Sequence, residues 1–149
     1  MKRREARELV VKALFACEIE KGDPFRQLEY IAGDWEMAGL DEGSRAPFLS
    51  GADNEYIRRL TTGILACREE LDDIIRQYSV DWELSRLGGA ERNILRMGLF
   101  EMLYDEKLHP AIAINEALEM IKKYCNSDAV KFINGILGKK AAEIKKDNQ

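Results

Sequence analysis

The sequence predicts an all-α protein, and three observations support this prediction. Apolar residues recur at helical spacings of three and four through most of the 149-residue chain. No segment alternates polar and apolar residues for long enough to predict a strand. Capping residues and glycines mark the starts and ends of the periodic segments. We therefore expect a compact helical bundle of about seven helices.

Two helices are predicted at the N-terminus. The opening stretch, MKRREARELVVKALFACEIEKGD, places its apolar residues on one helical face, and Gly22 is expected to end this helix. Asp23 and Pro24 suit the N-cap and first position of a second helix. The apolar residues are Ala6, Leu9, Val10, Ala13, Leu14 and Cys17 in the first helix and Phe25, Leu28, Ile31, Ala32 and Trp35 in the second.

A loop and a long helix are predicted next. Glycines and a proline indicate a loop from Gly39 to Asp53, the best candidate for a subdomain boundary or a variable insertion. From Asn54 to Tyr78, apolar residues repeat with 3-4-3-4 spacing, which predicts one helix packed lengthwise on its neighbours. At about 1.5 Å per residue it would be roughly 37 Å long. Its apolar seam is Ile57, Leu60, Ile64, Cys67, Leu71, Ile74 and Tyr78.

Four shorter helices are predicted in the last part of the chain. Residues 82–87 suggest a short helix closed by Gly88–Gly89. The helix with Ile94, Leu95, Leu99, Met102 and Leu103 contains Gly98, which costs about 1 kcal/mol relative to alanine and so indicates a close helix crossing. A third helix follows His109–Pro110. The last helix is expected to start at a cap formed by Ser127 and Asp128.

Little in the sequence points to catalysis. The only histidine, His109, precedes a proline and is better explained as a turn or capping residue than as a general base. The acidic pairs Glu69–Glu70 and Asp72–Asp73 are expected on the exposed side of the long helix. No glycine-rich phosphate loop and no metal-ligand spacing is present. We therefore predict no catalytic residue, no metal ligand and no cofactor.

Composition favours a cytoplasmic globular protein. The chain is 46% hydrophobic and 34% charged, and no apolar run approaches the roughly 20 residues that span a bilayer. Acidic residues interrupt the start of the chain where a signal peptide would need an apolar region. The three cysteines, Cys17, Cys67 and Cys125, are far apart and fit reduced thiols.

The strongest functional signal is positive charge at the N-terminus of an acidic protein. The formal net charge is -4, yet Lys2, Arg3, Arg4 and Arg7 lie close together on the first helical turns. The arginines are expected to face away from the apolar stripe, and they oppose the helix macrodipole, which favours anions at this end. Two interpretations stay open: a surface that binds phosphates, or a solvated terminus partly neutralised by nearby acids.

A second basic region lies in the last two helices, interleaved with aromatic residues. Phe132 is adjacent to Ile133, so both cannot occupy the centre of one inward stripe. Phe132 either flanks the core or is partly exposed and available to a nucleic-acid base or a partner protein. The lysines are Lys122, Lys123, Lys131, Lys139 and Lys140.

Four blocks of sequence resemble the NusB family of transcription antitermination factors. They are RREARELVVKALF near the N-terminus, then ERNILRMGLFEMLY, HPAIAINEALEMIKKY and SDAVKFINGILGK. The resemblance covers residues 2–20 and 82–139 and is most specific in AINEA and KFINGIL, whereas residues 33–53 add little. It implies a single domain of two small helical subdomains, residues 1–78 and 79–149, without catalytic activity.

The resemblance also implies a function and its partners. Such factors bind the boxA element of ribosomal RNA leader transcripts together with NusE, a small-subunit ribosomal protein, and act on the elongating RNA polymerase. By the family pattern, Glu5 interrupts the arginine-rich run and weakens it. The implied RNA-binding residues are Lys2, Arg3, Arg4 and Arg7, and the implied partner or RNA surface is Glu91, Asp128 and Phe132.

Two alternative functions stay open at this point. The chain could be a helical protein-interaction module whose basic start is incidental. NusB-like domains also occur fused to RNA cytosine methyltransferases, so an accessory domain of such an enzyme is the other alternative. This chain stops where the catalytic domain would begin, which favours the free-standing factor.

Overall fold

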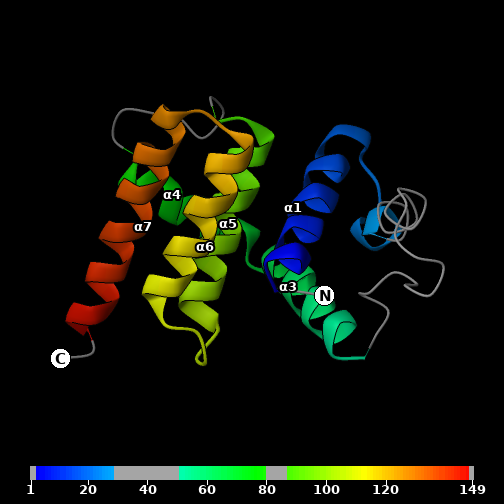
Figure 1. The fold of residues 1–149 in the computed structure, drawn as a ribbon, viewed down its shortest axis with the longest axis horizontal. Coiled ribbons are helices and arrows are strands. Elements are labelled where there is room, and N and C mark those ends of the chain that lie inside the picture. Colours follow the sequence, from blue (N-terminus) through cyan, green and yellow to red (C-terminus); the bar gives the residue numbers. More distant parts are fainter. Residues whose placement is uncertain (1–2, 29–50, 80–86, 148–149) are drawn as a thin grey trace. The chain divides into compact units, whose positions relative to one another are not determined.

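A computed structural model describes residues 3–28, 51–79 and 87–147 of the chain (Figure 1). These ranges form helices and connecting turns without a strand, which confirms the predicted all-α class. Residues 24–28 are helical as well. The other helices are α1 (Arg3–Glu20), α3 (Gly51–Ala66), α4 (Arg68–Tyr78), α5 (Gly89–Tyr104), α6 (Pro110–Tyr124) and α7 (Ser127–Asp147). None of the described helices is long and apolar enough to cross a membrane.

The chain divides into two compact units, Met1–Gly63 and Ile64–Gln149. The first contains α1, residues 24–28 and most of α3, and the second contains α4 to α7. The division falls before the subdomain boundary suggested after Tyr78, which stays a prediction.

In the first unit, the apolar face of α1 is buried as predicted. Its end differs slightly: Lys21, with φ of 50°, follows the last helical residue, and its N–H donates to the Cys17 carbonyl at 2.8 Å. Asp23 caps the next helix, because its Oδ1 accepts the Phe25 N–H at 3.0 Å. The buried core residues of this unit are Ala6, Leu9, Val10, Val11, Ala13, Leu14, Leu28, Tyr56, Ile57 and Leu60.

Several expectations fall on residues that the structure does not describe. These are Lys2, Ile31, Ala32 and Trp35, residues 82–86, and residues 39–50 of the expected loop. The end of that loop is a correction, because residues 51–53 already belong to α3. Gly89 likewise begins α5 and does not close the preceding helix.

The prediction of one continuous helix from Asn54 to Tyr78 is wrong. It is interrupted at Cys67, whose carbonyl still accepts the Leu71 N–H at 2.9 Å. Two features weaken the helix shortly before the interruption. The Thr61 hydroxyl donates to the Ile57 carbonyl at 2.7 Å, a bond that competes with the helical ladder, and Gly63 has low helix propensity.

The residues of α4 that face the core differ from the predicted seam. Leu71 and Ile75 are fully buried, whereas Ile74 and Tyr78, which the continuous seam placed inward, are only half-buried. Asp72 is buried together with Leu71 and Ile75. The predicted seam is therefore correct in α3 and shifted by one position at the end of α4.

In the second unit, α5 packs against α4, α6 and α7 (Figure 1). The predicted close crossing at Gly98 is confirmed. A Cβ atom at this position would lie 3.3 Å from the Cβ of Ala117 in α6 and 3.3 Å from a methyl group of Leu137 in α7. A glycine is therefore used where three helices come together.

The starts of α6 and α7 are set by side-chain caps. His109 is the N-cap of α6, because its Nδ1 accepts the Ala111 N–H at 3.0 Å, as the capping interpretation predicted. The predicted cap of α7 is wrong by one residue. Asn126 Oδ1 accepts the Ala129 N–H at 3.0 Å, and Ser127 and Asp128 belong to the first turn.

Candidate nucleic-acid interface

A tyrosine ring brings together arginines from two helices of the first unit. Tyr56 of α3 is only 5% exposed. The guanidinium carbon of Arg3 lies 3.8 Å from the centre of its ring, that of Arg7 lies 5.9 Å away, and that of Arg59 lies 5.8 Å away. All three distances are within the roughly 6 Å over which a cation is attracted to an aromatic face. We call Arg3, Arg7, Tyr56 and Arg59 the arginine cluster.

The predicted arginines of α1 differ in exposure. Arg3 and Arg4 are exposed, as expected. Arg7 is only 6% exposed, so its expected outward orientation is wrong. The reason is that Arg7 lies three and four residues before Val10 and Val11, which are both buried, so the buried face of α1 is wider than the apolar stripe suggested. An RNA-binding role for Arg7 stays a prediction.

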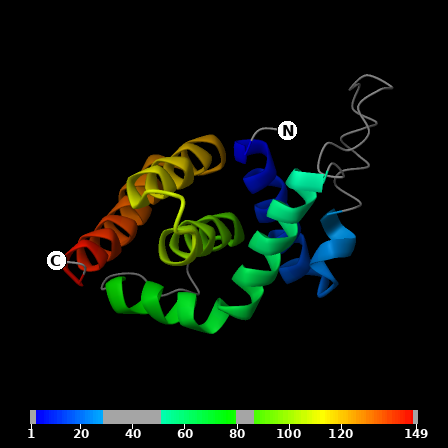
Figure 2. The same ribbon diagram turned by 90° about the horizontal axis from the view of Figure 1, so that it is seen from below.

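Arg59 was not found by sequence analysis. It lies on α3, next to Arg58, whose guanidinium carbon is 5.3 Å from the centre of the Phe25 ring. The available signal was the spacing of Tyr56 and Arg59, which places both on one side of a helix. No feature of the sequence indicated that this side of α3 faces α1, which Figures 1 and 2 show beside it.

The second predicted surface lies at the start of α7 and the start of α5. Asp128 is exposed and Phe132 is half-buried, one helical turn further on. Ile133 is completely buried. Phe132 therefore flanks the core, and part of its ring is open to solvent.

Glu91 connects the start of α5 to the turn between α6 and α7. Its carboxylate lies directly against Gly88, where a Cβ atom would collide with it. It also accepts a hydrogen bond from the thiol of Cys125, the C-cap of α6. Burial, followed by the charge and the hydrogen bond of Glu91, raises the pKa of this thiol to about 11. Glu91 therefore supports the turn from which Asp128 and Phe132 follow.

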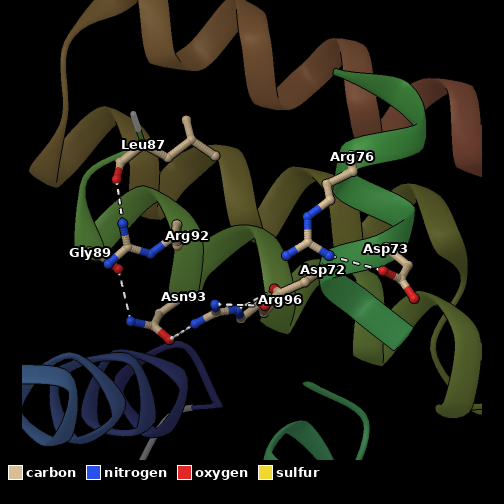
Figure 3. Close-up of polar contacts among 8 residues, drawn as sticks. All are labelled: Asp72, Asp73, Arg76, Leu87, Gly89, Arg92, Asn93 and Arg96. Atoms are coloured by element: carbon tan, nitrogen blue, oxygen red, sulfur yellow. Dashed lines mark hydrogen bonds and ion pairs between the residues drawn. The ribbon is translucent and has the colours of Figure 1, made fainter. Parts of the chain in front are cut away.

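A buried ion pair joins α4 and α5 (Figure 3). Arg96 of α5 and Asp72 of α4 are 4% and 8% exposed. Arg96 donates from Nε to Asp72 Oδ1 at 2.7 Å and from Nη2 to Oδ2 at 3.0 Å. The expected exposed position of Asp72 is therefore wrong, because its carboxylate pairs with Arg96 of α5.

The ion pair continues into a hydrogen-bonded network at the start of α5. Arg96 Nη1 donates to Asn93 Oδ1 at 3.2 Å, and Asn93 Nδ2 donates to the Gly89 carbonyl at 2.8 Å. Arg92 Nη1 donates to the Leu87 carbonyl at 2.6 Å. Figure 3 shows these bonds at the start of α5. The network fixes the turn that contains Glu91.

The other predicted acids of α4 are exposed, as expected. Asp73 pairs with Arg76 at 2.9 Å, and both side chains are largely in solvent. The Tyr104 hydroxyl donates to the Glu70 carboxylate at 2.7 Å. This hydrogen bond, followed by burial and the charge of Glu70, raises the pKa of Tyr104 to about 12.

The described residues offer two kinds of surface chemistry. The arginine cluster presents guanidinium N–H donors, which suit phosphate oxygens. Phe132 and Asp128 present an aromatic face and a carboxylate, which suit a nucleic-acid base or a protein partner. Within residues 3–28, 51–79 and 87–147, no group of three or more His, Cys, Asp or Glu side chains could hold a metal ion.

Comparisons with known proteins identify relatives of this chain. The family model described as the NusB family matches residues 4–142. The transcription antitermination protein NusB of Heliobacterium modesticaldum is 37% identical over 145 residues, which cover 97% of this chain and 65% of that relative's length. The structure of T. maritima NusB aligns with a TM-score of 0.79 and 34% identity, covering 96% of this chain and 92% of that chain. The crystal structure of NusB and NusE in complex with double-stranded RNA aligns with a TM-score of 0.75, covering 95% of this chain and 96% of that chain; at 24% identity it bears on the fold alone.

Proposed function

Because the chain belongs to the NusB family, we propose that it is a non-catalytic transcription antitermination factor that binds RNA. The observation that supports this proposal most directly is the arginine cluster. A protein with a formal net charge of -4 gathers three guanidinium groups around one aromatic ring. Phosphate contacts supply much of the affinity of proteins for nucleic acids.

We infer that the RNA is of the boxA type and that NusE binds at the same time. The chain is 37% identical to a NusB protein, and a NusB in complex with NusE and double-stranded RNA shares its fold; we base both partner classes on this family membership. In this proposal the complex acts on the elongating RNA polymerase in the cytoplasm. Single-stranded boxA RNA is expected, because unpaired bases expose the edges and faces that side chains can read.

The two surfaces have different tasks in this proposal. The N-terminal arginines, Arg3 and Arg4 among the described residues, hold phosphates and give affinity without sequence selection. Phe132 stacks on a base or packs against NusE, and Asp128 accepts hydrogen bonds from either. Glu91 holds the turn that precedes them. Selection of the RNA sequence therefore depends on the start of α7 more than on α1.

The proposal is tested by titrating a fluorescein-labelled boxA RNA with the full chain, with and without NusE. Replacing Arg3 and Arg4 by glutamine should weaken RNA binding by roughly tenfold or more, because phosphate contacts are lost. The salt dependence of binding should become weaker as well. A matched control replaces Lys145 and Lys146, exposed at the end of α7, by glutamine. It makes the same change in net charge and should leave RNA binding within about twofold.

Equal losses in both double variants would contradict a specific surface on α1. NusE should also raise the affinity for RNA. Tight NusE binding without any RNA binding would instead favour a protein-interaction module. A co-purifying RNA methyltransferase subunit would favour an accessory domain of that enzyme.

A further inference from the structure

The arginine cluster brings three like charges close to one aromatic ring. Arg3 and Arg7 belong to α1, and Arg59 belongs to α3. The ring of Tyr56 is the shared contact of all three guanidiniums. Its electron-rich faces attract each cation, so the ring fixes the spacing of the charges.

Exposure separates the members of the cluster into two pairs. Tyr56 and Arg7 are 5% and 6% exposed, so they are nearly inaccessible to a large ligand. Arg3 and Arg59 are exposed. A guanidinium that meets a ring with its flat face keeps its N–H donors at its edge, where they can bind an anion.

The acidic residue within the N-terminal run does not oppose this cluster directly. Arg3 and Arg7 are four residues apart and share one side of α1. Glu5 lies between them in sequence, which places it roughly 200° around the helix from each. Glu5 therefore lies on another side of α1 than Arg3 and Arg7. Arg59 adds a positive charge at the ring from another helix.

We propose that Arg59 binds RNA phosphate together with Arg3, and that Tyr56 and Arg7 are positioning residues for this pair. The inference rests on the proposed function, because it names a further residue of the same RNA-binding surface. The ligand group is a phosphate of single-stranded RNA, since paired guanidinium forks match phosphate oxygens. The surface then spans α1 and α3 and is not confined to the N-terminal run.

The test compares Arg59→Gln with Arg58→Gln in the full chain, using fluorescein-labelled single-stranded boxA RNA. Both arginines are exposed on α3 and both substitutions remove one charge, but the guanidinium of Arg58 lies over the ring of Phe25 and that of Arg59 over the ring of Tyr56. Arg59→Gln should weaken binding roughly fivefold. The negative slope of log affinity against log salt should become less steep by about 0.7. Arg58→Gln should change the affinity by less than about twofold.

The outcomes separate this inference from the proposed function. If Arg3→Gln weakens binding and Arg59→Gln does not, Arg59 is not a ligand and only this inference is overturned. Equal losses for Arg58→Gln and Arg59→Gln would show a diffuse charge effect and also overturn it. A wild-type chain that binds no RNA, with or without NusE, would remove the proposed function as well.

The positioning of Arg59 by the ring has its own test. Tyr56→Leu removes the aromatic face, whereas Tyr56→Phe keeps it. The leucine variant should weaken RNA binding about as much as Arg59→Gln, and the phenylalanine variant should restore most of the affinity. Combining Tyr56→Leu with Arg59→Gln should cost less than the product of the two single losses, because both act on one contact. Losses that multiply would contradict a positioning role.

Discussion

Replacing Arg96 by methionine removes one partner of the buried ion pair with Asp72 and leaves a carboxylate in the interior of the second unit. Asp72 is 8% exposed and accepts two hydrogen bonds from Arg96, at 2.7 and 3.0 Å. The same substitution removes the donor to Asn93 Oδ1. The Asp72 carboxylate and Asn93 Oδ1 are buried, so water cannot fully hydrate them without local unfolding.

The expected loss of stability follows from this geometry. Breaking a buried ion pair by removing one partner costs about 3–5 kcal/mol, because the remaining charge is uncompensated. For a chain of this length, each kcal/mol lowers the melting temperature by roughly 2–4 °C, so a decrease of about 10 °C is expected. Replacing both residues by apolar ones, Asp72→Leu with Arg96→Met, should restore most of the stability, since no unpaired charge is left.

Urea denaturation followed by circular dichroism measures these differences. The control is Arg76→Met, which breaks the exposed pair with Asp73 on the same helix. Its side chains are 60% and 75% exposed, so the expected cost is about 0–1 kcal/mol. If Arg96→Met costs no more than Arg76→Met, or if the double replacement is worse than the single one, this explanation of the buried pair is refuted.

Three other predictions concern the second unit. Gly98→Ala should destabilise the protein by about 1–3 kcal/mol in urea melts, because the added methyl group meets α6 and α7 at 3.3 Å; unchanged or higher stability would show that the crossing relaxes. Tyr104 should titrate near pH 12 by ultraviolet absorbance, and Glu70→Gln should move its pKa back toward 10. Because the pKa of Tyr104 is raised in the folded state, its hydrogen bond stabilises the fold below pH 10, and this stabilisation is lost as the pH rises from 10 to 12. A titration of Tyr104 near pH 10 in the wild type would contradict this. Cys125, with a pKa of about 11, should react slowly with a thiol reagent at pH 8, and Glu91→Gln should speed this reaction. Equal rates in the two proteins would contradict the effect of Glu91 on the thiol.

Periodicity predicted the fold well where one face of a helix determines its packing. The stripe of α1, from Ala6 to Leu14, is buried as expected. The glycine at position 98 signalled a close crossing, because glycine inside a helix is costly without such a reason. The histidine at position 109 was recognised as a cap from its place before a proline. These features depend on local sequence alone.

The features that were missed depend on tertiary contacts. Nothing in the apolar spacing distinguishes one helix from two that meet at Cys67, and nothing in it shows that Arg96 of α5 pairs with Asp72. The buried position of Arg7 likewise became clear only from the fold, where its guanidinium carbon lies 5.9 Å from the ring centre of Tyr56, a residue distant in sequence. Charge alone suggested that every arginine of the run faces solvent.

The candidate site was predicted in part. Charge and the family resemblance pointed to the arginines of α1 and to the start of α7. They did not point to Arg59, because its relation to Arg3 exists only once Arg3 of α1 lies over the ring of Tyr56 on α3. The acidic Asp128 and the half-buried Phe132 lie on one turn of α7, and the hydrogen bond from Cys125 to Glu91 connects that region to α5.

The affinity for boxA RNA as a function of salt, in the wild type and in the variant Arg3→Gln with Arg59→Gln, tests the central claim most directly. Loss of two phosphate contacts should make the negative slope of log affinity against log salt less steep by about 1.4. The circular dichroism spectrum and the melting temperature should stay unchanged. A variant with the wild-type slope and affinity would contradict the claim that this protein binds RNA through α1 and α3.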